Sequence, residues 1–169
     1  MNTPSTPATE GLSMEGLDIA PGFHHVAVQT DDVDATVRWY EEFLGATVEW
    51  SLDTFSPLTH ARLPGIKKLV EVKKGHVRFH VFDRAGHSRG GPDPLGYQYQ
   101  HIGITVNRPE DLARLRERWL RVRERTDLRW ARDEPPSDIV ADADGVQSLY
   151  VLDPNGLELE FIYFPGAGT

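Results

Sequence analysis

The sequence predicts an α+β fold made of two similar units in tandem. Three observations support this: an internal repeat, a helical stripe after each copy of it, and runs of alternating residues after each helix. With 169 residues, the chain can form one ordinary domain or two small fused units. Each half is therefore expected to fold as a strand, a helix and then about three strands.

The repeat lies at the start of each half. The segment Phe23–Val28 reads FHHVAV, and the segment Tyr99–Ile104 reads YQHIGI. Both contain an aromatic residue, a polar residue, a histidine, and then apolar, small and apolar residues. His25 and His101 therefore take the same place in the two units.

A helix is expected after each copy of the repeat. In the first half, Asp31 or Asp32 can cap the helix and Gly45 ends it. In the second half, Pro109 suits the first helical turn. Apolar residues recur at helical spacing in both halves, at Val33, Val37, Tyr40 and Leu44, and at Leu112, Leu115, Trp119 and Val122.

Strand-like segments follow each helix. They are residues 46–52, 59–63, 69–72 and 76–82 in the first half, and residues 128–132, 137–143, 146–152 and 157–164 in the second. The last strands of the two halves also align with each other. This alignment places His80 opposite Glu160 in the repeat.

Composition limits the domain organisation and the function. Residues 1–20 are rich in Pro, Thr, Ser and Gly and are expected to form a flexible tail. Residues 21–165 then form a single domain, with module one at 22–84, a Gly/Pro-rich connection at 85–97 and module two at 98–165.

Charge and cysteine content exclude several classes of function. The net charge of −8 argues against general nucleic-acid binding. Without cysteine there is no disulfide, thiolate nucleophile or zinc–thiolate site. No apolar run approaches the roughly 20 residues of a membrane span, and the N-terminus lacks the pattern of a secretory signal. We therefore expect a cytoplasmic protein without nucleic-acid or membrane partners.

Strand alternation places several metal-binding residue types on one face. If helices cover the apolar faces and the two sheets curve toward each other, the opposite faces line a cavity. Two imidazoles and one carboxylate can hold Fe(II) with open positions for substrate and oxygen. The same ligands suit Mn(II), Ni(II) or Zn(II). The residues on these faces are His25, His76, His80, His101, Glu158 and Glu160.

The repeat, with a histidine at the head of each half and DPNGLELEF at the end, resembles the vicinal oxygen chelate superfamily. That superfamily includes glyoxalase I, methylmalonyl-CoA epimerase, fosfomycin-resistance enzymes, bleomycin-binding proteins and type I extradiol dioxygenases. The resemblance implies two βαβββ modules that form an open, barrel-like sheet around a metal site. It also implies that His25, His101 and Glu160 are the ligands. Glu160 is preferred to Glu158 because the family ligand lies four residues after the glycine of the D-P-x-G turn, here Gly156.

The finer resemblance is to small, single-domain extradiol dioxygenases such as L-DOPA 2,3-dioxygenases. In KKGHVRF, His76 takes the place of their acid–base residue, and in SLYVLDPNGLELE, Tyr150 takes the place of a tyrosine that contacts the bound catecholate. The resemblance therefore implies Fe(II), a small catechol and O2. Arg78 and His80 are further candidates for substrate binding, because alternation turns them toward the cavity. Dimers are common in the family, so a homodimer is expected.

Two other functions stay open from the sequence. Glyoxalases and epimerases use the position of His80 for a fourth ligand, so a four-ligand site would favour a metal-dependent lyase or isomerase. The third function is a non-enzymatic drug-binding protein, which would use aromatic side chains. The intact set of His25, His101 and Glu160 argues against it.

Overall fold

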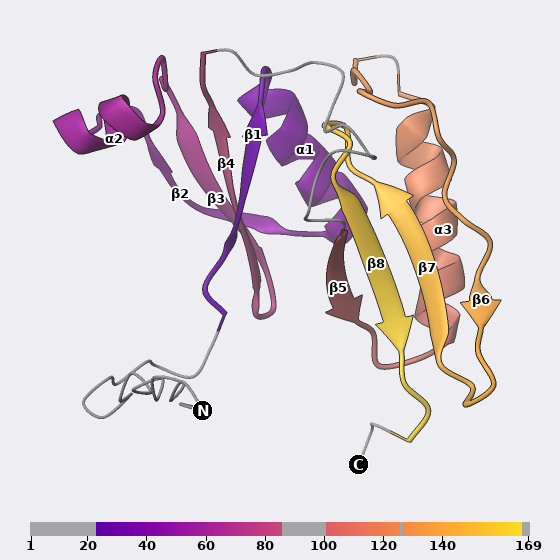
Figure 1. Cartoon of the computed structure of the whole chain (residues 1–169). Helices are drawn as coiled ribbons and strands as arrows, with labels where there is room; N and C mark the ends of the chain where they lie inside the picture. The colour runs from indigo at the N-terminus through magenta and orange to yellow at the C-terminus, as the bar shows by residue number, and fades with distance from the viewer. Residues whose placement is uncertain (1–22, 86–100, 126, 167–169) are drawn as a thin grey trace, which may run out of the picture.

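The computed structural model describes residues 23–85, 101–125 and 127–166. They form two units, each with one four-stranded mixed sheet and a long helix packed on one face (Figure 1). The predicted α+β fold with two tandem modules is confirmed. The sheets are separate and do not close into a barrel within the described residues.

Module one comprises six elements. They are β1 (Val26–Thr30), α1 (Val33–Leu44), β2 (Thr47–Leu52), α2 (Pro57–Arg62), β3 (Leu69–Lys74) and β4 (Val77–Asp83). The strand order is β1-β4-β3-β2, with β1 parallel to β4. The Asp32 side chain caps α1 by accepting a hydrogen bond from the backbone N–H of Ala35, and Gly45 ends the helix with φ 64°.

Module two repeats this topology with one helix fewer. Its elements are β5 (His101–Thr105), α3 (Glu110–Arg123), β6 (Val140–Ala141), β7 (Gln147–Leu152) and β8 (Glu158–Tyr163). The strand order β5-β8-β7-β6 matches that of module one. Ala27 pairs with His80 between β1 and β4, and Gly103 pairs with Glu160 between β5 and β8. The predicted correspondence of His80 and Glu160 is therefore confirmed by the register.

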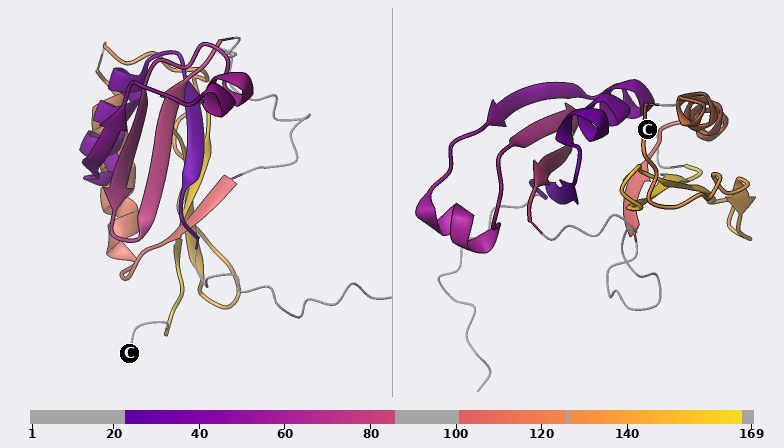
Figure 2. Two further views of the ribbon diagram at one scale, coloured as in Figure 1. Left: turned by 90° about the vertical axis from the view of Figure 1, so that its left-hand side faces the viewer. Right: turned by 90° about the horizontal axis from the view of Figure 1, so that it is seen from above.

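The helices α1 and α3 lie on the same side of the two sheets and contact each other (Figure 2). Trp39, Tyr40 and Phe43 of α1 and Trp119 of α3 are almost fully buried between these helices and the sheets. Each such side chain contributes about 2 kcal/mol or more by leaving water. The ring of Phe43 meets that of Phe161 edge-on at 5.8 Å, which joins the two cores. The opposite faces of the sheets stay open for a site.

Three of the predicted strands differ in the structure. Residues 59–63 were expected to be a strand but belong mostly to α2, because Pro57 starts a helical turn and the Ser56 side chain caps it. Residues 128–132 form no strand, and only Val140–Ala141 of residues 137–143 pair as β6. The prolines at 135 and 136, which have no backbone N–H to donate, precede that segment.

Two predicted segments lie outside the described residues. They are the N-terminal tail at 1–20 and the connection at 85–97, of which only Ala85 is described. In the described part of the chain, no helix has both the length and the apolar character to cross a membrane.

Candidate metal centre

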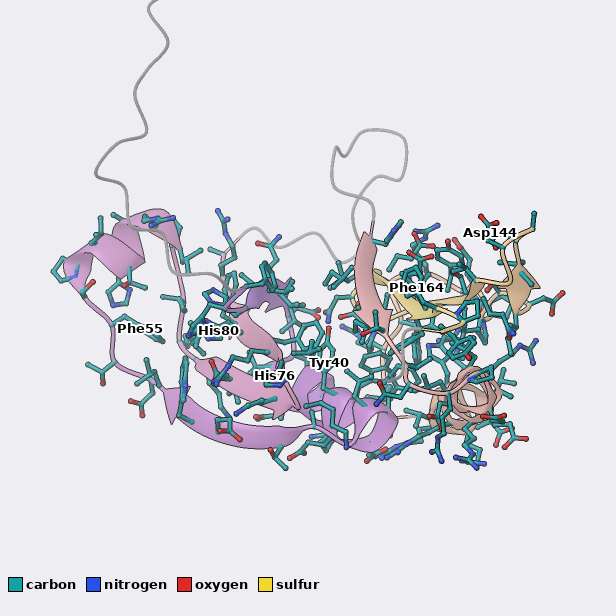
Figure 3. The ribbon with its side chains drawn as sticks, turned by 90° about the horizontal axis from the view of Figure 1, so that it is seen from below. Tyr40, Phe55, His76, His80, Asp144 and Phe164 are labelled. Atoms are coloured by element: carbon teal, nitrogen blue, oxygen red, sulfur yellow. The ribbon has the colours of Figure 1, made fainter. Side chains whose placement is uncertain are left out.

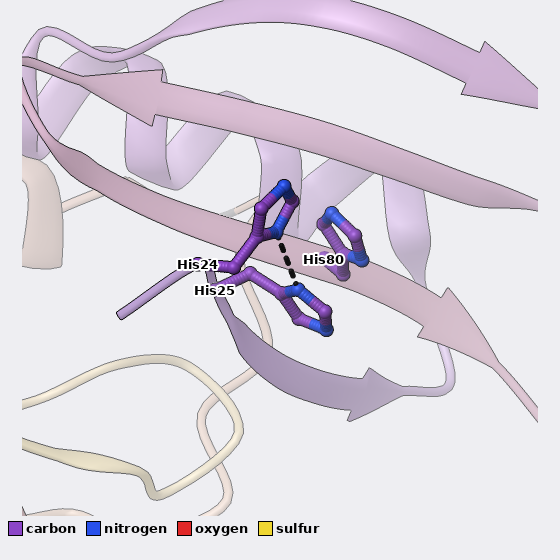
Figure 4. Close-up of side chains that lie close together, drawn as sticks. All are labelled: His24, His25 and His80. Atoms are coloured by element: carbon purple, nitrogen blue, oxygen red, sulfur yellow. Dashed lines mark hydrogen bonds between the residues drawn. The ribbon is translucent and has the colours of Figure 1, made fainter. Parts of the chain in front are cut away.

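Module one brings three histidines together at the head of β1. The rings of His25 and His80 stack with their centroids 3.6 Å apart and an angle of 12° between their planes. The Nδ1 atoms of His24 and His25 are 2.9 Å apart (Figure 4). One ring nitrogen from each of the three lies within 4.8 Å of the others, so these residues form a histidine cluster that could hold a metal ion.

A buried glutamate supports this cluster. Glu71 lies on β3 directly opposite His80 and is 1% exposed. Its Oε2 is 2.8 Å from His80 Nε2, and its Oε1 is 2.6 Å from Arg78 Nη1. Burial raises the pKa of Glu71, but the hydrogen bonds from His80 and Arg78 outweigh it and lower the pKa. The ionised carboxylate therefore accepts the hydrogen bond that His80 Nε2–H donates, and His80 Nδ1 makes no contact with Glu71.

Electrostatics favour the metal-binding form of His25. Burial lowers the pKa of His25, and the neighbouring His80 and His24 lower it further, while Glu71 acts in the opposite direction. The imidazole of His25 is therefore neutral near pH 7. Neutral imidazole is the form that donates a lone pair to a metal.

Module two holds another pair of candidate ligands, His101 and Glu160. We call this pair and the pair of His25 and His80 in module one the two half-sites. His101 begins β5, and its Nε2 lies 3.0 Å from Glu160 Oε2 on the adjacent β8. Tyr150, opposite Glu160 on β7, donates a hydrogen bond of 2.6 Å to Glu160 Oε1. This hydrogen bond and burial raise the pKa of Tyr150, so the phenol stays protonated. Glu160 is thus held by two strands at once.

The donor atoms of this half-site fit a divalent metal. An imidazole nitrogen and a carboxylate oxygen are ligand types that divalent metals take. His101 Nε2 and Glu160 Oε2 supply one of each and lie 3.0 Å apart, in direct contact. Among the described residues, His101 Nδ1 is buried without a hydrogen-bond partner, so no carboxylate or carbonyl of this part of the chain orients the ring from that side.

The structure arranges the expected ligands as two pairs. His25 lies with His80, and His101 lies with Glu160. Within the described residues, only His24, His25 and His80 place three ligand atoms mutually within 4.8 Å. His25 directly precedes β1 and His101 begins β5, and these are edge strands of two separate sheets, so within the described residues no sheet hydrogen bonds join the two pairs.

His76 does not lie on a strand, contrary to the sequence prediction. It follows Gly75 in the turn between β3 and β4, and its side chain is exposed. From there it lines two cavities between the modules, of about 580 and 500 Å³. Figure 3 shows His76 and His80 on module one. The positive φ of Gly75 favours a tight turn at this point, which starts β4 only at Val77.

Sequence reasoning missed Glu71. It lies in a run of three buried residues with valines on either side. A single carboxylate within an apolar run was the available signal of a functional or paired residue, because a buried charge needs partners. Its opposite partner, His80, became evident only with the register of β3 and β4.

Comparison with protein families gave one match. The model of the "Glyoxalase/Bleomycin resistance protein/Dioxygenase superfamily" matches residues 22–161. No curated protein matches the chain.

Solved structures share the fold at low sequence identity. A glyoxylase/bleomycin resistance protein/dioxygenase domain from Frankia sp. EAN1pec has a TM-score of 0.65 and 17% identity, covering 85% of this chain and 97% of that one. Lactoylglutathione lyase from Agrobacterium tumefaciens has a TM-score of 0.53 and 20% identity, covering 85% and 93%. The fosfomycin resistance protein FosX from Listeria monocytogenes, complexed with Mn(II) and sulfate, has a TM-score of 0.54 and 13% identity, covering 86% and 93%.

Proposed function

The chain belongs to the Glyoxalase/Bleomycin resistance protein/Dioxygenase superfamily, and we propose that it is an Fe(II)-dependent extradiol dioxygenase that cleaves a small catechol with O2. The candidate substrates, L-DOPA and related catechols, follow from the resemblance to the small single-domain extradiol enzymes. The observation that carries the proposal is that His101 and Tyr150 both contact the Glu160 carboxylate. These contacts place the phenol of Tyr150, which can contact substrate, beside the proposed ligands His101 and Glu160.

His25, His101 and Glu160 would hold the metal. Fe(II) bound by two imidazoles and one carboxylate supplies open positions for substrate and oxygen. Mn(II), Ni(II) and Zn(II) suit the same donors, so the choice of Fe(II) rests on the resemblance of His76 and Tyr150 to the extradiol enzymes.

Tyr150 and His76 would act on the substrate. The Tyr150 hydroxyl donates to Glu160, and its oxygen, which Ser148 also approaches, would accept a hydrogen bond from a catechol hydroxyl. His76 would accept and return a proton as the general acid–base, a role that rests on its place in KKGHVRF, since no proposed metal ligand lines the two cavities that His76 lines. An imidazole suits this role because its ordinary pKa is near neutrality.

The test is oxygen consumption. The protein is reconstituted with Fe(II) without air, catechols including L-DOPA are added, air is admitted, and oxygen uptake is followed with visible absorbance. We expect oxygen uptake with a yellow semialdehyde product, and none with Glu160→Ala. If no catechol causes oxygen consumption, ring cleavage is ruled out as the function.

We also propose that the protein is a homodimer in which module one of one copy faces module two of the other. This arrangement would bring His25 of one chain to the His101–Glu160 pair of its partner, which the single chain keeps in separate half-sites. Co-expression of His25→Ala with Glu160→Ala would then restore roughly a quarter of the activity, since half of random dimers carry one intact site. If the mixture is as inactive as each variant alone, the site forms within one chain.

A glyoxalase- or epimerase-like function is the second candidate. The observation that favours it is the histidine cluster, in which His80 stacks on His25 and keeps its Nδ1 free of Glu71. A four-ligand site with His80 would polarise a carbonyl and stabilise an enediolate. Co(II) spectra distinguish the two: His80→Ala changes the visible absorption of the Co(II) protein only if His80 is a ligand.

A further inference from the structure

A cavity of about 320 Å³ opens on the inner face of module one, beside the histidine cluster. His25 and His80 form its polar floor, and Leu69 and Phe82 are among its apolar walls. The helix α2 closes the remaining side with Leu58 and Arg62. This volume falls at the lower end of small-molecule sites, so it suits a compound with a single ring.

Arg62 is the one fixed charge that lines this cavity in the described chain, and no acidic side chain lines it there. Its side chain is exposed and forms no hydrogen bond or ion pair with any described residue. Arg78, the candidate that alternation favoured, instead binds Glu71 at 2.6 Å. The guanidinium of Arg62 is therefore the cation that remains available to a ligand.

The walls and the charge together define the chemistry of the ligand. A planar guanidinium matches a carboxylate with two parallel hydrogen bonds. The single positive charge of Arg62 matches the single negative charge of a carboxylate. The rings of Phe82 and His80, with Trp50 edge-on to His80 at 4.9 Å, suit an aromatic body.

We propose that Arg62 binds the side-chain carboxylate of an aromatic substrate in this cavity and makes the protein select carboxylated catechols. The ring then lies toward His25, and the carboxylate lies at the exposed wall formed by α2. The catechol part of this inference rests on the proposed function, whereas the carboxylate site does not.

Calorimetric titration of the full-length protein without oxygen tests the selection. We expect 3-(3,4-dihydroxyphenyl)propanoate to bind at least about tenfold more tightly than 4-ethylcatechol, the factor of a charge-assisted hydrogen bond. Arg62→Met should abolish this preference and leave 4-ethylcatechol binding unchanged. The control is Arg84→Met, since Arg84 also has no partner among the described residues and does not line the cavity.

A further probe separates this inference from the proposed function. 3-Phenylpropanoate has the carboxylate but no catechol, so its binding to the metal-free protein should depend on Arg62 even if no catechol is cleaved. The proposal is overturned if 3-phenylpropanoate does not bind the wild type, or if Arg62→Met keeps the preference.

Discussion

At the residue scale, the two half-sites use matching positions for different chemistry. The pair of Glu71 and His80 in module one corresponds in register to the pair of Tyr150 and Glu160 in module two. In both pairs one side chain orients the other: Glu71 accepts from His80, and Tyr150 donates to Glu160. Such support fixes the orientation of a ligand before a metal arrives.

The loss of the Tyr150 hydroxyl should therefore weaken metal binding. We expect Tyr150→Phe to lower the Co(II) affinity about 10- to 100-fold, the usual effect of removing a group that orients a ligand. Titration against a chelator measures it. Tyr163→Phe is the control, because Tyr163 also lies in the sheet of module two, packed against the core. Equal affinities of Tyr150→Phe and the wild type would show that Glu160 needs no such support.

At the element scale, the sequence predicts strands and helices best where the apolar pattern and the residues at both ends indicate the same element. The helix α1 has both an apolar stripe and its caps at Asp32 and Gly45, and it forms as expected. The helix α2 was missed because its six residues are too short to show a stripe. Likewise, alternation predicted which face of β4 holds His80, but it could not predict that a turn would start the strand after His76.

Because His76 lies in this turn, its substitution can separate an effect on catalysis from an effect on metal binding. Because the exposed His76 side chain lies in a turn outside both half-sites, His76→Ala should keep the metal and lose turnover. Metal analysis and oxygen uptake of the same sample check this. Lys74→Ala, two residues earlier and also exposed, is the control. Normal turnover in His76→Ala would remove its proposed acid–base role.

At the scale of the whole molecule, a buried carboxylate ties the modules together. Asp153 follows β7 and accepts backbone hydrogen bonds of 2.8 Å from Asn155 and Leu157, which shape the turn before β8. Its other oxygen accepts a hydrogen bond of 3.1 Å from Tyr40 of α1. The sequence predicted the turn at Asp153, but the long-range bond to Tyr40 depends on how the modules pack.

This carboxylate should make stability depend on pH. Burial raises the pKa of Asp153 to about 6, although its hydrogen bonds act in the opposite direction. Between its ordinary pKa of 3.8 and about 6, the folded state binds more protons than the unfolded state, so this group's contribution to the free energy of unfolding falls as pH rises. At about 1.4 kcal/mol for each pKa unit, the fall amounts to about 3 kcal/mol.

Denaturant unfolding of the wild type and Asp153→Asn at several pH values measures this contribution. The variant keeps an acceptor for the turn but cannot ionise. We expect the stability of the wild type relative to Asp153→Asn to decrease from pH 4 to pH 6 and then to level off. A difference that does not change with pH would show that Asp153 does not titrate in this range.

Metal stoichiometry of purified variants tests the central claim, a metal site made of His25, His101 and Glu160, most directly. After anaerobic loading with Fe(II) and removal of free metal, the wild type should retain one iron per chain. His25→Ala and Glu160→Ala should retain almost none, and Glu158→Ala should behave as the wild type. If Glu160→Ala retains one tightly bound iron per chain, the claim is contradicted.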